Sequence, residues 1–338
     1  MPKPLLPVAG KPILAWTLER LAGIGCEAVA INLHHLGEAI RQRLGDRFQD
    51  MPLRYSEEPE LLGTLGAFGP LRQFFAAADL ILVINGDSLC NWPLKRLIRR
   101  HQASQAQATL LLAKRPDPSD FGGGVAIDKK GRVLSLFTDD EARGEVARRH
   151  VFAGAHVLSP SLMFRVGDGP ADFVSDLYLP LLGEGARIQG VVTGRRWHDL
   201  GTARRFLDAA LDWGRGRWPA RLWRRNWVAR DAQVESRSRL AACVVEADAR
   251  VEAGSRLTRT LVMPGGRVHG QSRLEECIVG PGAVLPTGSR ISRRVVVPQG
   301  TSQRPREGDT VVGGMIYHPL DETTASSRSR KSRGGEGA

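Results

Sequence analysis

The chain has 338 residues, of which 42% are hydrophobic and 25% are charged, and its formal net charge is +12. These values are ordinary for a folded protein with a sizeable core, and the length predicts two domains. Apolar runs fall short of the ~20 residues that a membrane span requires, and the N-terminus has no secretory pattern. We therefore expect a cytoplasmic protein that does not bind a membrane.

The basic charge and the cysteines narrow the choice of ligands. The 48 lysines and arginines are spread along the chain rather than gathered in one stripe, which disfavours nucleic acid and leaves a nucleoside triphosphate as an acidic partner. The cysteines form neither a CxxC pair nor a Cys/His cluster of metal spacing. We interpret them as free thiols in a reducing compartment, and they are Cys26, Cys90, Cys243 and Cys277.

The first two thirds of the sequence alternate short apolar runs with amphipathic stretches. The strands that this pattern predicts are 28–33, 80–85, 108–113, 125–128, 151–157 and 188–192. The predicted helices are 13–22, 37–44, 94–103, 174–182 and 203–213. Strands that alternate with helices indicate an α/β domain, Rossmann-like with a mainly parallel sheet, over residues 1–213. Ligands of such sheets bind beyond the carboxyl ends of the strands.

Residues 214–227 interrupt this alternation with a basic stretch that is rich in tryptophan. Arginines interleaved with tryptophans can bind RNA or a membrane surface. The interpretation that we favour is a junction between domains, in which the tryptophans pack on neighbouring residues and the arginine stems cover apolar surface.

From Val228 onward the sequence repeats with a period of 17 residues. Aliphatic residues follow at intervals of six, six and five, at Val228, Val234, Leu240, Val245, Val251, Leu257, Val262, Val268, Leu274, Val279, Leu285, Ile291 and Val296. This period suits neither a helix nor a single strand, and it is typical of a coil with three short faces that each send one aliphatic side chain inward. We predict a left-handed parallel β-helix of hexapeptide repeats over residues 228–300. Residues 301–338 lose the pattern, and we expect an irregular, largely disordered tail.

Short motifs in the α/β region occur in an order that is typical of one family. They read PKPLLPVAGKP at residues 2–12, LGTLGA at 62–67, NGD at 85–87, FAGAHVL at 152–158 and WHDLGT at 197–202. Together they resemble the sugar-1-phosphate nucleotidyltransferases, and among these the bacterial proteins similar to mannose-1-phosphate guanylyltransferases. The resemblance covers residues 1 to about 213 and extends into the β-helix, which many members append.

The resemblance implies a reaction. A sugar 1-phosphate attacks the α-phosphorus of a nucleoside triphosphate, and an NDP-sugar and pyrophosphate result. Such a transfer requires that phosphate charge is neutralised and that the two anions are held in line, which Mg²⁺ achieves with a few carboxylates. The implied cofactor is therefore Mg²⁺, and the implied partners are the nucleoside triphosphate and the sugar 1-phosphate, without nucleic acid or membrane. The base, the sugar and the oligomeric state, with a homo-oligomer as one alternative, stay open.

The resemblance also assigns roles to single residues. Asp87 and Asp199 are implied to hold Mg²⁺, and Lys3 to contact phosphate oxygens, so these three form the predicted catalytic set. Taken singly, an aspartate here is equally a turn former or a helix cap, and Lys3 a solvated charge. The predicted substrate-binding residues are Gly63, Thr64 and Gly66 for the base, Asn85 and Gly86 of the NGD motif, and Gly122 and Gly154 for the sugar.

Two elements of the family pattern are absent from the sequence. Members begin with a central strand and a GxGTR loop directly before PKP, and the backbone N–H groups of that loop cradle the triphosphate. Only Met1 and Pro2 precede Lys3, and the EKP element expected near residues 136–140 is missing as well. We therefore expect residues 1–338 alone to leave the neighbours of that strand unpaired.

Three hypotheses follow from these departures. The leading one is an NDP-sugar synthase that is truncated at its N-terminus. The alternative is a catalytically inactive regulatory or scaffold homologue that has lost its phosphate loop. A third is acyl transfer by the β-helix, which would need a histidine base, and His269 is the only histidine in the repeat.

Overall fold

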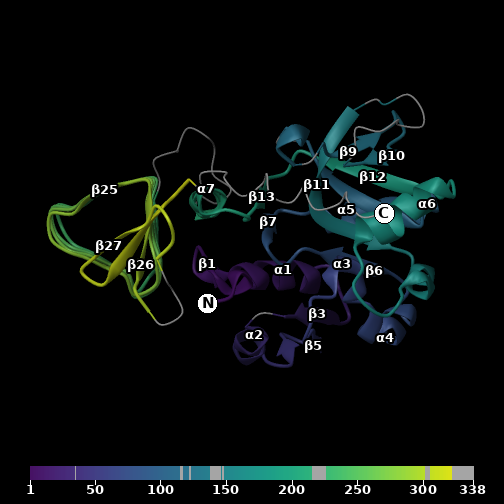
Figure 1. Ribbon diagram of the computed structural model, residues 1–338, viewed down its shortest axis with the longest axis horizontal. Helices are drawn as coiled ribbons and strands as arrows, with labels where there is room; N and C mark the ends of the chain where they lie inside the picture. Colours follow the sequence, from purple (N-terminus) through teal and green to yellow (C-terminus); the bar gives the residue numbers. More distant parts are fainter. Residues whose placement is uncertain are drawn as a thin grey trace, which may run out of the picture. The chain divides into compact units, whose positions relative to one another are not determined.

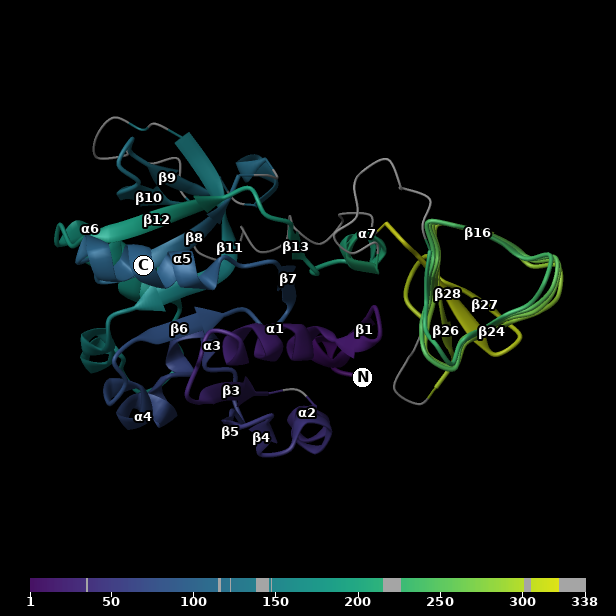
Figure 2. The same cartoon turned by 180° about the vertical axis from the view of Figure 1, so that it is seen from behind.

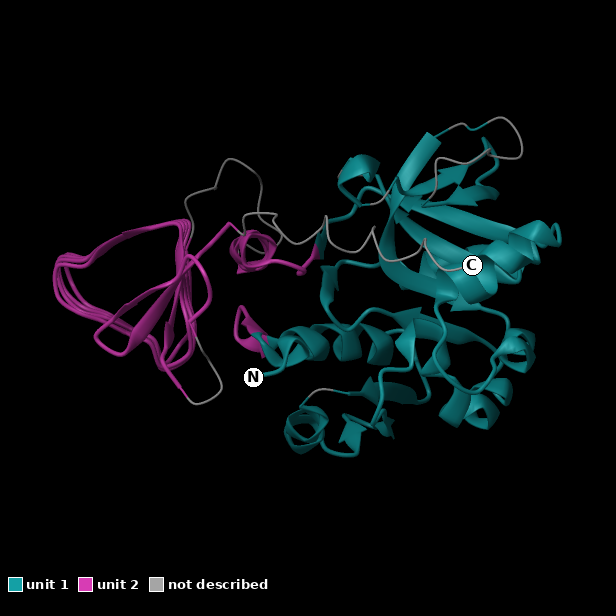
Figure 3. Cartoon of the chain, viewed as in Figure 1, with its two compact units in different colours: residues 1–6, 12–198 teal, residues 7–11, 199–338 magenta. Residues whose placement is uncertain are grey.

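The computed structural model describes residues 1–34, 36–114, 117–121, 123–137, 146, 148–214, 226–300 and 305–321 (Figures 1 and 2). The chain divides into two compact units, one of residues 1–6 and 12–198 and the other of residues 7–11 and 199–338 (Figure 3). The division therefore falls between His198 and Asp199, before the expected boundary at residue 213. Most of the predicted basic junction, residues 215–225, lies outside the described residues.

The first part of the first unit is a small sheet with its helices. The sheet has the order β3-β5-β4, in which β3 and β5 are parallel and β4 and β5 antiparallel. Helices α1 and α2 begin and end where the periodicity predicts. The elements are η1 (Lys3–Leu5), α1 (Ile13–Ala22), β3 (Val29–Leu33), α2 (Gly37–Leu44), β4 (Arg47–Phe48), β5 (Met51–Glu57), α3 (Gly63–Gly66), η2 (Gly69–Leu71) and α4 (Arg72–Ala76).

The second part of this unit is a six-stranded sheet of order β10-β9-β11-β8-β12, with β6 also paired to β11. Its strands are β6 (Ile81–Ile84), β8 (Ala108–Ala113), β9 (Val125–Ile127), β10 (Val133–Leu136), β11 (Arg148–Leu158) and β12 (Ile188–Thr193). The other elements are β7 (Ser88–Cys90), α5 (Leu94–Ser104), η3 (Pro118–Phe121), η4 (Pro160–Arg165), the π-helix η5 (Phe173–Tyr178), α6 (Leu179–Gly183) and β13 (Trp197–Asp199).

The strand directions confirm the α/β class and correct one detail. Strand β8 is parallel to β12, and β11 is antiparallel to both β6 and β8, so β6, β8 and β12 run the same way and β11 is reversed. The expectation of a mainly parallel sheet does not hold for β11, nor for β10, which is antiparallel to β9. Strand β11 also pairs antiparallel with β9, which forms an antiparallel hairpin with β10, and antiparallel neighbours do not need the crossover helix of a parallel pair.

The predicted helix 174–182 is helical throughout in the structure, but it changes its winding along its length. Its first part is the π-helix η5, and α6 follows it with Pro180 in its first turn. Proline has no backbone N–H to continue the hydrogen-bond ladder of the preceding turn. No helix among the described residues is long and apolar enough to cross a membrane.

The two sheets of the first unit are not joined to each other. Among the described residues β3 pairs only with β5, and β6 only with β11, and Figures 1 and 2 draw β3 and β6 as separate ribbons. A cavity of about 1020 Å³ borders both strands. Its walls there are mostly apolar, with Leu18 and Leu21 from α1, Ile31 from β3, Leu82 and Ile84 from β6, and Phe75 from α4.

This arrangement has an energetic cost, because a free strand edge in an apolar surrounding leaves backbone N–H and C=O groups without partners. Each unsatisfied buried polar group costs about 1–3 kcal/mol. Because one cavity borders both β3 and β6, we expect that an added strand would pair with these edges and occupy part of the cavity.

We predict that a version of the chain extended ahead of Met1 by an apolar strand and a GxGTR-type loop is markedly more stable than residues 1–338. Several satisfied backbone groups would be a large fraction of a typical net stability of about 5–15 kcal/mol. Denaturant unfolding of both proteins measures the difference, with a Gly/Ser extension of equal length as the control. Equal unfolding midpoints for the three proteins would show that the open edges need no strand.

The C-terminal unit contains the predicted parallel β-helix. Its strands stack in three parallel sheets, and each pairing joins residues 17 apart, as Val245 with Val262. The coils comprise β14 (Trp227–Val228), β15 (Gln233–Val234), β16 (Arg239–Ala241), β17 (Val244–Val245), β18 (Arg250–Val251), β19 (Arg256–Thr258), β20 (Leu261–Val262), β21 (Arg267–Val268), β22 (Arg273–Glu275), β23 (Ile278–Val279), β24 (Val284–Leu285), β25 (Arg290–Ser292) and β26 (Arg294–Pro298).

The aliphatic positions of the repeat form the core of this unit. Val251 and Val268 are fully buried there, as predicted. Val228 is the exception, because it lies in the first coil and is 41% exposed. Helix α7 (Ala203–Gly214) belongs to the same unit and contacts β17 and β20.

The expectation of an irregular tail is wrong for residues 310–319. Strands β27 (Thr310–Val312) and β28 (Met315–Pro319) form an antiparallel hairpin, and β28 pairs with β26. The last coil of a β-helix would otherwise present an open edge, and a hairpin that covers such an edge is a common solution. The 17-residue pattern misses it because the apolar period changes from six to two. Residues 301–304 and 322–338 lie outside the described residues.

We predict that Val268→Asp destabilises the β-helix by on the order of several kcal/mol, because it buries an unpaired charge. Val284→Asp is the matched control, since Val284 lies on the next coil of the same sheet and is 37% exposed. Thermal unfolding followed by circular dichroism compares the two. Similar midpoints for both variants would contradict the inward placement of Val268.

Candidate active site

The predicted residues Lys3 and Asp87 meet in the first unit. Lys3 lies on η1 and Asp87 in the turn that follows β6, and the lysine Nζ donates a hydrogen bond to Asp87 Oδ2 at 2.8 Å. The side chains are 35% and 44% exposed. An ion pair this exposed adds little to stability, and both groups stay accessible to a ligand.

The NGD motif sits where strands of an α/β sheet present their ligands. Strand β6 ends at Ile84, and Asn85 N donates to the carbonyl oxygen of Gly154 on β11 at 2.8 Å. Gly154 has a φ of +68°, and a Cβ atom there would lie 3.3 Å from the Asn85 Cβ. Gly154 therefore supports the turn that carries Asn85, Gly86 and Asp87.

The LGTLGA motif forms the short helix α3, and its glycines allow close approach to another part of the chain. A Cβ atom at Gly63 would lie 2.6 Å from the carbonyl oxygen of Ala171, and one at Gly66 would lie 2.4 Å from that of Gly169. Thr64 Oγ1 donates to Asp172 Oδ2 at 2.8 Å. The motif is thus fastened to the segment before η5, a constraint that the sequence did not reveal.

These residues share the cavity already described. Thr64, Asn85, Gly86 and Asp87 line it together with Asp172 and the apolar residues of α1, β3 and β6. Gly122, predicted for the sugar pocket, lies outside the described residues. The cavity thus combines an apolar part beside two strand edges with polar groups that include Asp87, the carboxylate to which Lys3 donates.

The sequence did not single out His156, which also lines this cavity. The imidazole is buried and its Nδ1 shares a hydrogen bond with the hydroxyl of Tyr178. Burial lowers the pKa of His156 to about 3, so the ring is neutral at physiological pH. It can offer a hydrogen bond or an aromatic face between Phe152 and Phe173, and it carries no charge.

Asp199 belongs to the second unit and is paired with an arginine, whereas Asp87 is paired with a lysine. Its Oδ2 accepts a hydrogen bond from Arg205 Nη1 at 2.5 Å. Thr202 Oγ1 accepts from the Arg205 backbone N–H at 3.2 Å, at the start of α7. A Cβ atom at position 201 would lie 2.9 Å from Asp199 Oδ2, so the glycine of WHDLGT leaves room for this carboxylate. The sequence analysis named Asp199 and did not single out Arg205, its partner here.

The turn of the N-terminal motif is held by a buried carboxylate of the second unit. Between β1 (Pro7–Val8) and β2 (Lys11–Pro12), Gly10 N donates to Glu246 Oε2 at 2.9 Å. Gly10 has a φ of +82°, and a Cβ atom there would approach the Trp227 ring to 3.2 Å. Glu246 is 1% exposed, and its Oε1 has no hydrogen-bond partner among the described residues. Burial raises the pKa of this carboxyl.

This raised pKa predicts a pH-dependent stability. The protonated form is favoured in the folded state, so the contribution of Glu246 is fully present below its ordinary pKa of 4.5 and is lost as pH rises through the raised value. Glu246→Gln should therefore unfold at a higher temperature than the native chain at pH 8, by on the order of a few degrees, and the difference should vanish near pH 4. Thermal scans across this range measure it, with Glu275→Gln, which removes an exposed charge, as the control. A lower midpoint for Glu246→Gln at pH 8 would show that the charged carboxylate is the stabilising form.

The fold and these pairs define a class of protein, namely an α/β ligand-binding unit with a lysine–aspartate pair beyond a strand end, followed by a parallel β-helix. Residues 1–215 match the family model described as Nucleotidyl transferase. The chain belongs to this nucleotidyl transferase family, and the resemblance to sugar-1-phosphate nucleotidyltransferases is confirmed.

Relatives of known activity support the same family. The chain is 30% identical over 226 residues to a mannose-1-phosphate guanylyltransferase of Mycobacterium tuberculosis. This alignment covers 65% of the chain and 60% of the relative. The chain is 28% identical over 210 residues to the mannose-1-phosphate guanylyltransferase catalytic subunit beta of Drosophila pseudoobscura pseudoobscura, with 61% and 55% covered. The match thus spans less than two thirds of these relatives' length.

Solved structures support the fold. The crystal structure of HddC from Yersinia pseudotuberculosis superimposes with a TM-score of 0.53 at 21% identity, over 63% of this chain and 90% of that chain. The same protein complexed with GMP-PN gives a TM-score of 0.53 at 22% identity. At this identity the similarity concerns the fold.

Proposed function

We propose that the protein transfers a nucleotidyl group from a nucleoside triphosphate to a sugar 1-phosphate, giving an NDP-sugar and pyrophosphate. The observation that carries the proposal is the Lys3–Asp87 pair, which lies just beyond the carboxyl end of β6 and beside a large cavity. The relatives named above make GTP and mannose 1-phosphate the first substrates to test.

Asp87 and Asp199 are the residues that we propose for Mg²⁺. The described residues contain no group of three or more His, Cys, Asp and Glu side chains placed to hold a metal. That is compatible with Mg²⁺, which is commonly bound through one or two carboxylates, with waters and substrate phosphates as its other ligands. Bound there, the ion would neutralise charge on the phosphates.

Each of these carboxylates is already paired with a basic side chain, and this pairing suggests a role for the basic residues. Lys3 holds Asp87, and Arg205 holds Asp199. When triphosphate arrives, Lys3 can turn its Nζ from Asp87 to a phosphate oxygen, because the ammonium is compact and its stem is flexible. That movement leaves Asp87 free to accept a metal. The cation and the carboxylate thus exchange partners without leaving a bare charge.

The remaining predicted residues would orient the substrates. Gly63, Thr64 and Gly66 are proposed to approach the base, and Asn85 and Gly86 the phosphates or ribose near Asp87. Gly154 supports this turn through Asn85. Gly122 is kept as a proposal for the sugar pocket.

We predict that Asp87→Asn and Asp199→Asn each lower turnover by about 10²–10³-fold and leave the fold intact, since one lost contact to developing charge commonly has this effect. Pyrophosphate release with Mg²⁺, GTP and mannose 1-phosphate measures it, in a protein carrying the N-terminal extension described above. Asp50→Asn, an exposed aspartate of the first unit, is the control. Turnover near that of the parent protein would remove the substituted residue from the mechanism.

The alternative is a catalytically inactive regulatory or scaffold homologue. The observation that favours it is the split sheet, in which β3 and β6 each have one strand edge without a partner among the described residues. GTP binding measured by equilibrium dialysis separates the two. The enzyme hypothesis requires binding and turnover in the extended protein, whereas the alternative requires neither. Acyl transfer stays the weakest hypothesis, because the family model matches residues 1–215 and not the β-helix that contains His269.

A further inference from the structure

Helix α7 lies against the β-helix within the second unit. Its buried side chains include Phe206, Leu207 and Leu211, and it contacts β17 and β20. A Cβ atom at Gly214 would lie 2.8 Å from the Val244 side chain, so the end of the helix touches the coil closely. Apolar contacts of this kind are not directional and do not by themselves fix the rotation of a helix.

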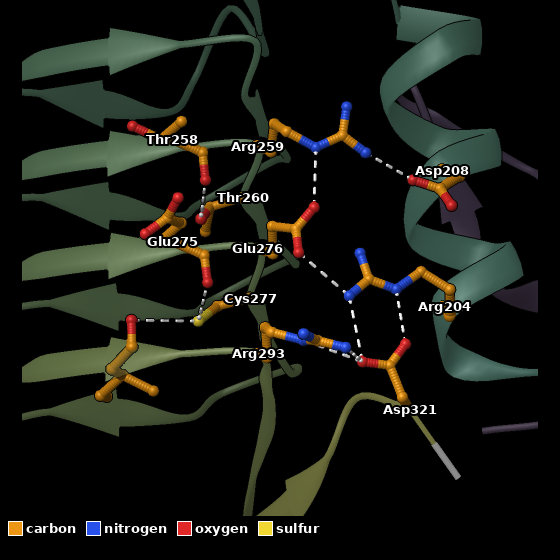
Figure 4. A network of polar contacts seen from close by, with 11 residues as sticks. Arg204, Asp208, Thr258, Arg259, Thr260, Glu275, Glu276, Cys277, Arg293 and Asp321 are labelled. Carbon is orange, nitrogen blue, oxygen red and sulfur yellow. Dashed lines mark hydrogen bonds and ion pairs between the residues drawn. The ribbon is translucent and has the colours of Figure 1, made fainter.

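A chain of alternating charges runs along the same contact (Figure 4). We call this chain of charges the ionic ladder. In the order of their contacts, its members are Asp208, Arg259, Glu276, Arg204, Asp321 and Arg293. Successive members are joined at 2.7, 3.1, 3.1 and 2.8 Å from Asp208 to Asp321, and Arg293 Nε donates to Asp321 at 3.0 Å. Three positive and three negative groups alternate, so the ladder is neutral.

Arg204 is the central member of the ladder. Its guanidinium donates to both Asp321 oxygens, at 2.8 and 3.2 Å, and to Glu276 at 3.1 Å, and its side chain is 23% exposed. Hydrogen bonds from Arg204 and Arg293 lower the pKa of Asp321 to about 2, so this carboxylate is charged across the physiological range. Charge-assisted bonds of this planar type have a defined geometry.

The backbone of the coils directs the ladder toward α7. Arg259, Glu276 and Arg293 stand one coil apart at the same corner, with φ values of 47°, 51° and 53°. Such left-handed positions favour glycine or asparagine, and long charged residues are uncommon there. Figure 4 shows these three side chains projecting from the coils to the helix that carries Arg204 and Asp208.

The signs of the ladder determine one register. A slip of α7 along the coils would bring Arg204 toward Arg259 or Arg293, and like charges in contact are unfavourable. Buried or half-buried ion pairs contribute little net stability, and selecting a register is the role best supported for them.

The ladder reaches the site through consecutive residues. Arg204 and Arg205 are neighbours in the first turn of α7, and they point in different directions because a helix turns by about 100° per residue. Arg204 faces the ladder, and Arg205 holds Asp199. We propose that the ionic ladder is a positioning device which, through the first turn of α7, sets the place of Arg205 and of the carboxylate of Asp199. The proposal rests on the metal-binding role proposed for Asp199.

The test uses Arg204→Gln and Asp321→Asn in the full chain, because the two changes remove the same bridge from its opposite partners. Arg204→Lys is the conservative variant that should restore part of the effect. Arg256→Gln is the matched control, since Arg256 is an exposed arginine of β19 without a side-chain contact among the described residues. Unfolding midpoints verify that each variant is folded.

Two measurements report on position. Hydrogen exchange of residues 199–206 should rise in Arg204→Gln and Asp321→Asn and stay unchanged in Arg256→Gln. Mn²⁺ binding in the presence of GTP, followed by electron paramagnetic resonance in the full chain carrying the N-terminal extension described above, should weaken about 10-fold in both ladder variants, the lower end of the range for groups that orient a metal ligand. Asp199→Asn should weaken it at least as much.

The outcomes separate this proposal from the proposed function. If Asp199→Asn weakens Mn²⁺ binding and the ladder variants do not, the positioning role is wrong and the metal role stands. If Asp199→Asn leaves Mn²⁺ binding unchanged, the metal role of Asp199 fails and this proposal falls with it. Weakened binding in all three variants, partly restored in Arg204→Lys, supports both.

Discussion

The need to pair backbone N–H and C=O groups governs how both units are built. In the β-helix each coil bonds to the next one 17 residues later, and the antiparallel strand β28 closes the last coil. In the α/β unit the same requirement is met from β11 outward to β12, and it fails beside β3 and β6. The fully paired strands and the strands with a free edge are therefore described by one rule, applied to strands that have neighbours and to strands that lack one.

Electrostatic pairing is the second organising feature. Asp87 and Asp199, the two carboxylates proposed for the metal, are each held by a basic side chain from a nearby helical turn. Under the proposed function this arrangement would favour the entry of charged phosphates, because each carboxylate is paired with a cation before the substrate binds. The neutral His156, held in an aromatic cluster, contributes shape and not charge.

How far the sequence predicted the structure depended on whether a feature was local. Helices α1, α2 and α5 follow from their own periodicity, and the β-helix follows from a period that each coil repeats. The reversed direction of β11 and the hairpin of β27 and β28 depend on connections that periodicity does not record. The membership of α7 in the second unit was not predicted for a similar reason. The apolar face of α7 shows that the helix is packed on one side, but it does not show which surface it packs against.

The site shows the same limit. Motif order selected Lys3, Asp87 and Asp199, yet the pairing of Lys3 with Asp87 joins residues 84 positions apart. Arg205 lies outside the WHDLGT motif and had no feature that distinguished it from other arginines. The glycines of LGTLGA were selected by resemblance. Only the structure shows that they make room for the carbonyls of Gly169 and Ala171.

The hydrogen bond between Gly10 and Glu246 has a consequence for synthesis on the ribosome. The turn at residues 7–11 is grouped with the C-terminal unit, and its anchor lies 236 positions later in the chain. Chains emerge from the N-terminus and domains fold as they appear, so this turn cannot take its final place until the second coil has been made. One of the earliest segments to leave the ribosome is therefore among the last to be fixed, and contacts of such long separation form slowly.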